Sequence, residues 1–212
     1  MTTYSLTDLA LRHGSLLRDT VVPARMSLAG WYRAHTSGRL VRLHPGVSRL
    51  ACTAPTAMMR LEAALGAAMA GSAIAGLTAA WLWGAPSATH SVVELIAPPY
   101  RHPGRLEGVE FHRPTDSSYP RTCTVQGLRA CEPLRAILDV AAWHPDRLDA
   151  VLAELVQLGC FGIDAVHDML RRERRQGRPG VTALDAALAR WDKQPGSAAT
   201  GSAALMGGLV TV

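Results

Sequence analysis

The hydrophobic period of this 212-residue chain changes abruptly at Gly38. Before that glycine, apolar side chains recur every three or four residues, which predicts a helix over residues 28–37 that Ser27 caps. After it, the period becomes two over residues 39–51, and the pair Pro45-Gly46 interrupts the alternation. This pattern predicts a β-hairpin directly after the helix.

The residues before this segment predict two more short helices. One covers residues 5–14, and a second covers residues 18–22, where Pro23 interrupts it. Three helices followed by a hairpin are the outline of a winged helix-turn-helix, which we expect over residues 1–51.

The third of these helices has two different faces. Its apolar face is expected to point inward and consists of Leu28, Trp31, Tyr32 and His35. The opposite face presents Gly30, Arg33, Ala34 and Ser37. We therefore assign Trp31 and Tyr32 to the core rather than to base stacking.

The positive charge of the chain is concentrated in the same region. Residues 1–50 hold seven arginines and two aspartates, a net charge of +5, whereas residues 51–212 hold 15 basic and 15 acidic groups. Such a cationic patch is typical of a protein that binds a polyanion, although a GC-rich genome also favours arginine over lysine and the patch could be a solvated surface. The side chains expected to contact double-stranded DNA are Arg33, Ser37, Arg39, Arg42, His44 and Arg49.

The remainder predicts a second domain over residues 52–193 and an uncharged, small-residue tail over residues 194–212. Helical periodicity occurs over residues 56–70, 72–83, 132–142, 146–158, 163–175 and 182–191. Strand-like runs occur over residues 91–97, 109–113 and 122–125. The expected fold class is α+β, with a winged helix first, a mixed α+β domain next and a helical C-terminal half.

Several classes of protein are disfavoured. No residue from Ala63 to Val93 is charged, but the stretch is rich in Ala and Gly, so buried helices are preferred to a membrane span. Four scattered cysteines and the lack of a signal peptide suggest free thiols and a cytoplasmic protein. Nucleotide-binding, hydrolase and zincin motifs are missing, and His90, His102 and His112 match no ligand pattern. We expect no enzyme activity, no cofactor and no metal.

Five stretches of the sequence, in matching order, resemble the AbiEi-like antitoxins of type IV toxin-antitoxin systems and their actinobacterial relatives. They are Gly38–Val47, Thr78–Gly84, Gly108–Arg113, Arg135–Ala141 and Arg175–Gly180. The family often has Ser-His where this chain has Ala75-Gly76, and Tyr where it has Ser48.

The resemblance implies a sequence-specific DNA-binding repressor that regulates its own promoter, with a nucleotidyltransferase-like toxin encoded nearby as a partner. The second domain would supply oligomerisation or partner contacts. Many relatives continue into a domain that resembles very-short-patch-repair endonucleases. Here no acidic residue follows Asp192, so we expect that nuclease to be absent. The alternative is the non-catalytic targeting half of a truncated or split endonuclease-family protein.

A second group of cations lies near the end of the helix over residues 163–175. It consists of Arg171, Arg172, Arg174 and Arg175 and could add phosphate contacts. A solvated helix end that complements the helix dipole is the preferred interpretation. Arg135 and Asp139, four residues apart, are expected to form a structural pair.

Overall fold

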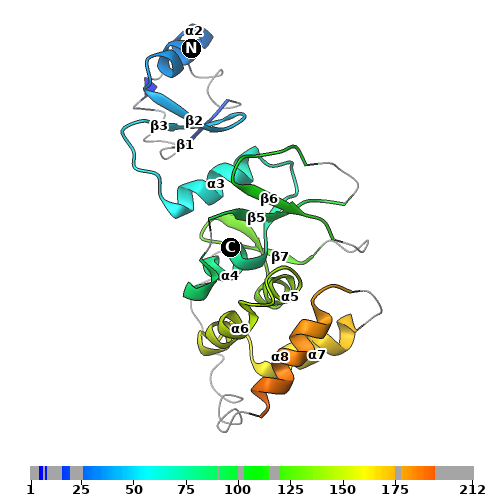
Figure 1. Cartoon of the computed structure of the whole chain (residues 1–212). Helices are drawn as coiled ribbons and strands as arrows, with labels where there is room; N and C mark the ends of the chain where they lie inside the picture. The colour runs from blue at the N-terminus through cyan, green and yellow to red at the C-terminus, as the bar shows by residue number, and fades with distance from the viewer. Residues whose placement is uncertain are drawn as a thin grey trace. The chain divides into compact units, whose positions relative to one another are not determined.

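The structure is a computed structural model that describes residues 5, 6, 8, 16–19, 26–89, 91–99, 103–114, 120–174 and 178–193. It contains two compact units. One comprises Met1–Ala75 and His90–Cys131, and the other comprises Gly76–Thr89 and Glu132–Val212 (Figure 1). The expected boundary at residue 51 does not coincide with this division, because residues 1–51 fall in the same unit as the second sheet.

The first unit begins with a three-stranded antiparallel sheet. Its strands are β1 (Leu16–Arg18), β2 (Leu40–His44) and β3 (Val47–Leu50), in the order β1-β3-β2. The predicted hairpin is therefore confirmed, and Gly46 at its turn has φ +76°, a conformation that glycine adopts without a steric cost. Helix α2 (Leu28–Thr36) is confirmed too, since Ser27 Oγ accepts a hydrogen bond of 3.1 Å from the Gly30 N–H.

The two earlier helices have different outcomes. Leu6 and Asp8 are helical, and Ser5 and Asp8 exchange reciprocal side-chain-to-backbone bonds that begin a helix there. The prediction of a helix from Arg18 is wrong at that residue, because residues 16–18 pair with β3 as a strand. Residues 9–15 and 20–25, which carry the rest of these predictions, lie outside the described part of the chain.

The inward face of α2 is rotated from the predicted one. Trp31 and Ala34 are buried and pack with Leu6, Leu17 and Leu40. By contrast, the side chains of Leu28 and Tyr32 are 59% and 62% exposed. The buried residues Trp31 and Ala34, three positions apart, form one narrow stripe of this nine-residue helix. Leu28 and Tyr32 lie outside that stripe and face solvent.

Helix α3 (Ala57–Ala67), predicted over residues 56–70, packs against both sheets of this unit. The second sheet has five strands in the order β6-β5-β4-β8-β7. They are β4 (Ala73–Ile74), β5 (Val93–Ile96), β6 (Val109–His112), β7 (Thr122–Val125) and β8 (Leu128–Cys131). The pairs β5–β6 and β4–β8 are parallel, and β4–β5 and β7–β8 are antiparallel. The three predicted strands are confirmed, and β4 and β8 were not predicted.

The uncharged stretch from Ala63 to Val93 changes structure several times. The predicted helix over residues 72–83 is wrong at its start, because Ala73 and Ile74 form the central strand of the five-stranded sheet. The helical part is α4 (Gly76–Leu82), in the second unit. Among the described residues, no helix combines the length and hydropathy that a membrane span requires.

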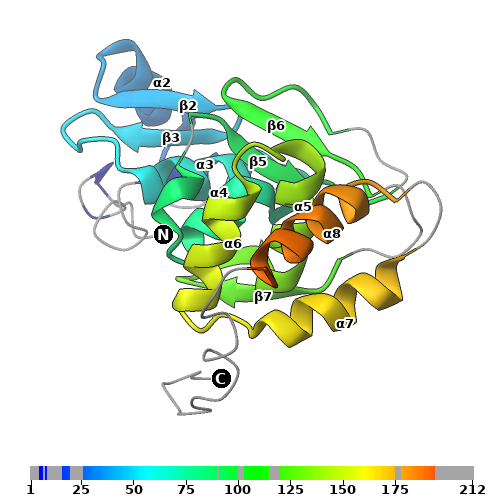
Figure 2. The ribbon, with the colours of Figure 1, turned by 60° about the horizontal axis from the view of Figure 1, so that its bottom comes forward.

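The second unit is helical, as predicted for the C-terminal half. Besides α4 it contains the 3₁₀ helix η1 (Pro86–Ala88), α5 (Pro133–Trp143), α6 (Leu148–Gln157), α7 (Ile163–Glu173) and α8 (Val181–Trp191). In Figures 1 and 2, α7 and α8 lie side by side. The expected Arg135–Asp139 pair forms on α5, with 2.7 Å between Nε and Oδ1 and with Asp139 buried. The two sheets and these helices place the chain in the α+β class.

Candidate nucleic-acid interface

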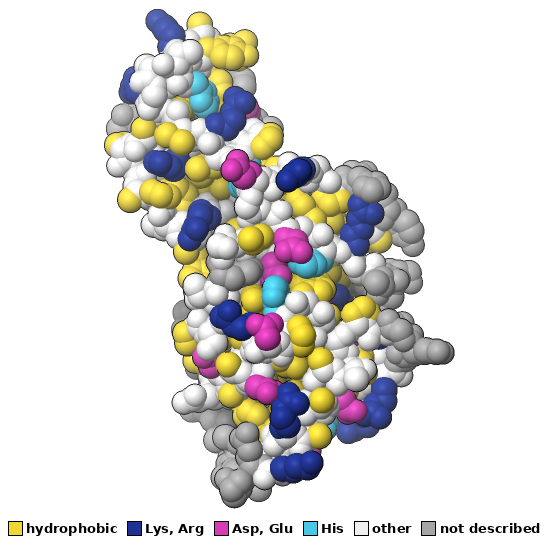
Figure 3. All heavy atoms as spheres, viewed as in Figure 1, with side chains coloured by type: hydrophobic (Ala, Val, Ile, Leu, Met, Phe, Trp, Pro, Cys, Tyr) yellow, Lys and Arg dark blue, Asp and Glu magenta, His cyan; other side chains and the backbone are white. Residues whose placement is uncertain are grey.

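The segment that forms α2 and the hairpin carries cations and no acidic group. Residues 26–55 contain four arginines and neither Asp nor Glu. In Figure 3, arginine side chains lie around α2 and the three-stranded sheet, with exposed hydrophobic side chains beside them. Within the described residues, Arg33, Arg39 and Arg42 form no ion pair with a carboxylate. Their charges are therefore available to an external anion.

Arg33 projects from the exposed side of α2. Its Nε lies 3.4 Å from the carbonyl oxygen of Ala29, one turn earlier, so the stem follows the helix surface. Leu28 and Tyr32 are exposed as well, but they lie roughly 100° or more around the helix from Arg33. The exposed surface of α2 therefore carries one guanidinium and, on another side, two large apolar groups that the sequence pattern had placed in the core.

Ser37, Arg39 and Arg42 continue this surface into the hairpin. Ser37 caps the end of α2, where its N–H donates to the carbonyl oxygen of Arg33 at 2.9 Å. Gly38 has φ +71° and turns the chain between the helix and β2. Arg39 and Arg42 are both exposed, the first before β2 and the second within it. The three predicted residues thus lie on solvent-facing positions.

An open hollow of about 660 Å³ lies beside α2. Its charged or hydroxyl lining comes from Arg33, Arg39, Ser5, Thr36 and Ser37, and the remaining lining is apolar. Two guanidinium groups at one hollow suit a phosphate group, because arginine donates bidentate hydrogen bonds to phosphate oxygens.

His44 ends β2 and is half-buried. Burial lowers the pKa of His44 below its ordinary value, and the charge of Glu107 opposes that shift. At neutral pH the imidazole is therefore neutral, and it can bind an anion only as a hydrogen-bond donor. Its predicted role in DNA binding stays a prediction.

Arg49 has a different environment from the other predicted cations. Its Nη1 donates to three backbone carbonyl oxygens, those of Leu50 at 3.0 Å, Ala51 at 3.3 Å and Thr53 at 2.6 Å. These contacts hold the chain where it leaves β3. They favour a structural role for Arg49 over the predicted contact with DNA.

Two of the four cations in the second predicted group are paired with carboxylates. Arg171 pairs with Asp168, and Arg174 pairs with Asp185 at 2.6 Å. Arg172 is exposed, and Arg175 lies outside the described residues. A group whose charges are paired offers little to a phosphate, in agreement with the preferred interpretation from the sequence.

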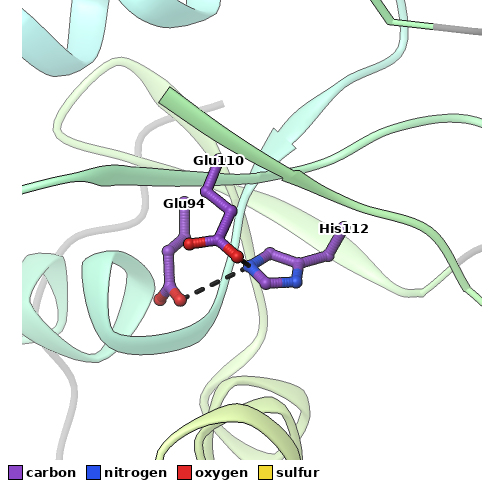
Figure 4. Close-up of side chains that lie close together, drawn as sticks. All are labelled: Glu94, Glu110 and His112. Atoms are coloured by element: carbon purple, nitrogen blue, oxygen red, sulfur yellow. Dashed lines mark ion pairs between the residues drawn. The ribbon is translucent and has the colours of Figure 1, made fainter. Parts of the chain in front are cut away.

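One cluster was missed in the sequence. Glu94, Glu110 and His112 come together on the five-stranded sheet (Figure 4). His112 was considered as a ligand only with His90 and His102, both of which lie outside the described residues. The signal that could have found the cluster is the alternation of Glu110 and His112, which places both on one face of a strand.

Comparison with known proteins gives a fold and no family. No family model matches the sequence, and neither does any curated protein. Among solved structures, the crystal structure of the RV2827C protein from Mycobacterium tuberculosis is similar, with a TM-score of 0.60 and 18% sequence identity. The match covers 94% of this chain and 81% of that one. The chain therefore shares the α+β fold of the mycobacterial protein.

Proposed function

We propose that the chain binds double-stranded DNA through α2 and the β2–β3 hairpin. The observation that carries the proposal is the surface formed by Arg33, Arg39 and Arg42, exposed and without a carboxylate partner among the described residues. Because phosphates occur along DNA at short intervals, three such cations on one surface can each neutralise one and release counterions. Because two of the four cations in the second group are paired with carboxylates, this surface is the better candidate of the two.

The arrangement of elements supports a winged helix as the binding fold. A strand, a helix and a hairpin follow one another, and the strand completes a three-stranded sheet beside the hairpin. In helix-turn-helix proteins the recognition helix enters the major groove. Helix α2 would be that helix, and the β2–β3 hairpin would contact the flanking backbone.

The exposed Leu28 and Tyr32 support contact with bases in addition to phosphates. Arginine reads guanine in the major groove, and apolar side chains contact the methyl group of thymine. A helix that bound only phosphates would gain nothing from two large exposed apolar groups. We infer that binding is sequence-specific.

The biological role that we propose is that of a cytoplasmic transcriptional repressor, similar to a type IV antitoxin, that acts on its own promoter. The resemblance in five stretches of sequence supports this role, as does the surface described above. The likeness to the mycobacterial structure bears on the fold alone.

The test is fluorescence anisotropy with labelled DNA from upstream of the gene, at two or more salt concentrations. Three phosphate contacts predict a slope of about −3 for log affinity against log salt. Arg33→Ala and Arg42→Ala should each weaken binding and reduce the slope by roughly 1. Arg121→Ala removes an exposed arginine elsewhere in the same unit and is the matched control. Equal affinity of all four proteins would contradict the proposal.

A further inference from the structure

Two carboxylates and an imidazole meet on one face of the five-stranded sheet. Glu94 on β5 is the register partner of Glu110 on β6, and His112 lies two residues further along β6. The His112 Nε2 atom is 3.4 Å from Glu94 Oε1 and 3.9 Å from Glu110 Oε1. Figure 4 shows the three side chains converging from the two strands.

The cluster gathers negative charge, and two of its three side chains are largely buried. The side chain of Glu94 is 1% exposed, and that of His112 is 13% exposed. Like charges directly opposite each other on paired strands destabilise a sheet. A divalent cation between the two carboxylates would relieve this repulsion and would also accept the lone pair of a neutral imidazole.

We propose that Glu94, Glu110 and His112 bind a divalent transition-metal ion, with Zn²⁺ as the best match. One nitrogen and two carboxylate oxygens are ligands that Zn²⁺ uses, whereas Mg²⁺ and Ca²⁺ prefer oxygen alone. The site is independent of the proposed DNA-binding surface.

The distances are close to those of a bound ion. Zinc lies about 2.0–2.2 Å from such ligands, so two ligand atoms at a tetrahedral angle are roughly 3.3–3.6 Å apart. The distance from His112 to Glu94, 3.4 Å, lies in this range, and that to Glu110, 3.9 Å, is slightly longer. All the ligand atoms lie within 4.8 Å of one another, so the widest separation needs to close by at most roughly 1.2 Å. Glu110 is 59% exposed and can rotate to do so.

A bound ion would hold the edge of the sheet. Strand β6 is one of the two outer strands of the sheet, and β5 is its neighbour. An ion that joins Glu94 to the two β6 side chains would therefore resist separation of β6. A ligand that binds only the folded state raises the apparent stability of the protein. Zinc binding should therefore raise the Tm in addition to being measurable as binding. Three protein ligands leave a fourth position for water.

The experiment uses the full chain after treatment with a chelator that is then removed. ZnCl₂ is titrated by calorimetry, and thermal unfolding is followed with and without one equivalent. We expect one tight equivalent and a higher Tm with zinc. Glu110→Gln and His112→Gln should each weaken this equivalent by roughly tenfold or more and remove most of the Tm shift.

Three variants serve as controls. His167→Gln removes a histidine that faces one carboxylate, Asp192, at 3.5 Å. Glu62→Gln removes an exposed carboxylate from α3, and Cys52→Ser removes the exposed thiol. Each should bind zinc as the unmodified protein does. The exposed position of Glu110 keeps its variant informative even if His112→Gln does not fold.

Two results would overturn the proposal. The first is the absence of a tight zinc equivalent in the unmodified protein, which would make the cluster an ion-paired group of the sheet. The second is a zinc affinity of Glu110→Gln that equals the affinity of the control variants. Neither result depends on whether the protein binds DNA.

Discussion

Gly180 lies so close to α5 that a Cβ atom at this position would be 2.6 Å from the carbonyl oxygen of Leu138. The same atom would be 2.9 Å from the backbone nitrogen of Ala142, and the φ of Gly180 is +84°. Both partners are backbone atoms, which cannot rotate away as a side chain can. The start of α8 can therefore approach α5 because residue 180 has no side chain.

We expect Gly180→Ala to destabilise the second unit by about 2 kcal/mol or more, from the positive φ and the forced backbone shift together. Urea unfolding followed by tryptophan fluorescence measures this, since four of the five tryptophans lie in this unit. Gly159→Ala is the matched control, because Gly159 has φ +70° and nothing within 4 Å of its added Cβ. An equal loss in both variants would show that the close approach contributes nothing.

Arg42 and Arg49 should separate binding from stability. Arg42→Ala removes an exposed cation, so affinity for DNA should fall while the unfolding free energy stays within about 0.5 kcal/mol. Arg49→Ala removes three hydrogen bonds to backbone carbonyls and should cost about 1–2 kcal/mol of stability. Urea unfolding and fluorescence anisotropy on both variants check this. A larger loss of affinity for Arg49→Ala, with stability unchanged, would instead support direct contact of Arg49 with DNA.

Leu28 and Tyr32 should contribute to sequence preference more than to salt dependence. The unmodified protein is first used to select a preferred DNA from a random duplex library. Its affinity for this DNA is then compared with its affinity for the same DNA in which uracil replaces thymine, a change that removes only the methyl groups. Affinity should fall a few-fold for the unmodified protein and less for Leu28→Ala or Tyr32→Ala, with an unchanged salt slope. Equal sensitivity to the missing methyl groups in all three proteins would exclude both side chains from thymine contacts.

His44 should make stability depend on pH. Because the folded-state pKa is lowered by burial, the unfolded chain takes up the proton first as the pH falls. The stabilisation is complete above the ordinary pKa of about 6.5 and is lost as the pH drops from there toward the folded-state pKa. Urea unfolding at pH 7.5 and 5.5 should show a smaller loss for His44→Gln than for the unmodified protein. An identical loss in the two proteins would assign the pH dependence to other groups.

Local signals predicted much of the secondary structure. Helix α2 was predicted from Ser27 and the periodicity of residues 28–37, and the hairpin was predicted from the Pro45-Gly46 turn. Both predictions were possible because capping and turn formation depend on neighbouring residues. The C-terminal helices were predicted for the same reason. By contrast, Ala73 and Ile74 are strand residues because β5 and β8 flank them, and a run of two residues is too short to show the period of a strand.

The sequence alone determined where the cations lie, since the absence of Asp and Glu from residues 26–55 can be read directly. Tertiary structure decided what those cations can contact. The fold ties Arg49 to three carbonyl oxygens, leaves Arg33 and Arg42 exposed, and turns Tyr32 outward. It also pairs Glu94 with Glu110, sixteen positions apart, through parallel strands. Such contacts depend on strand register and on which stripe of a helix is buried, and non-local packing sets both.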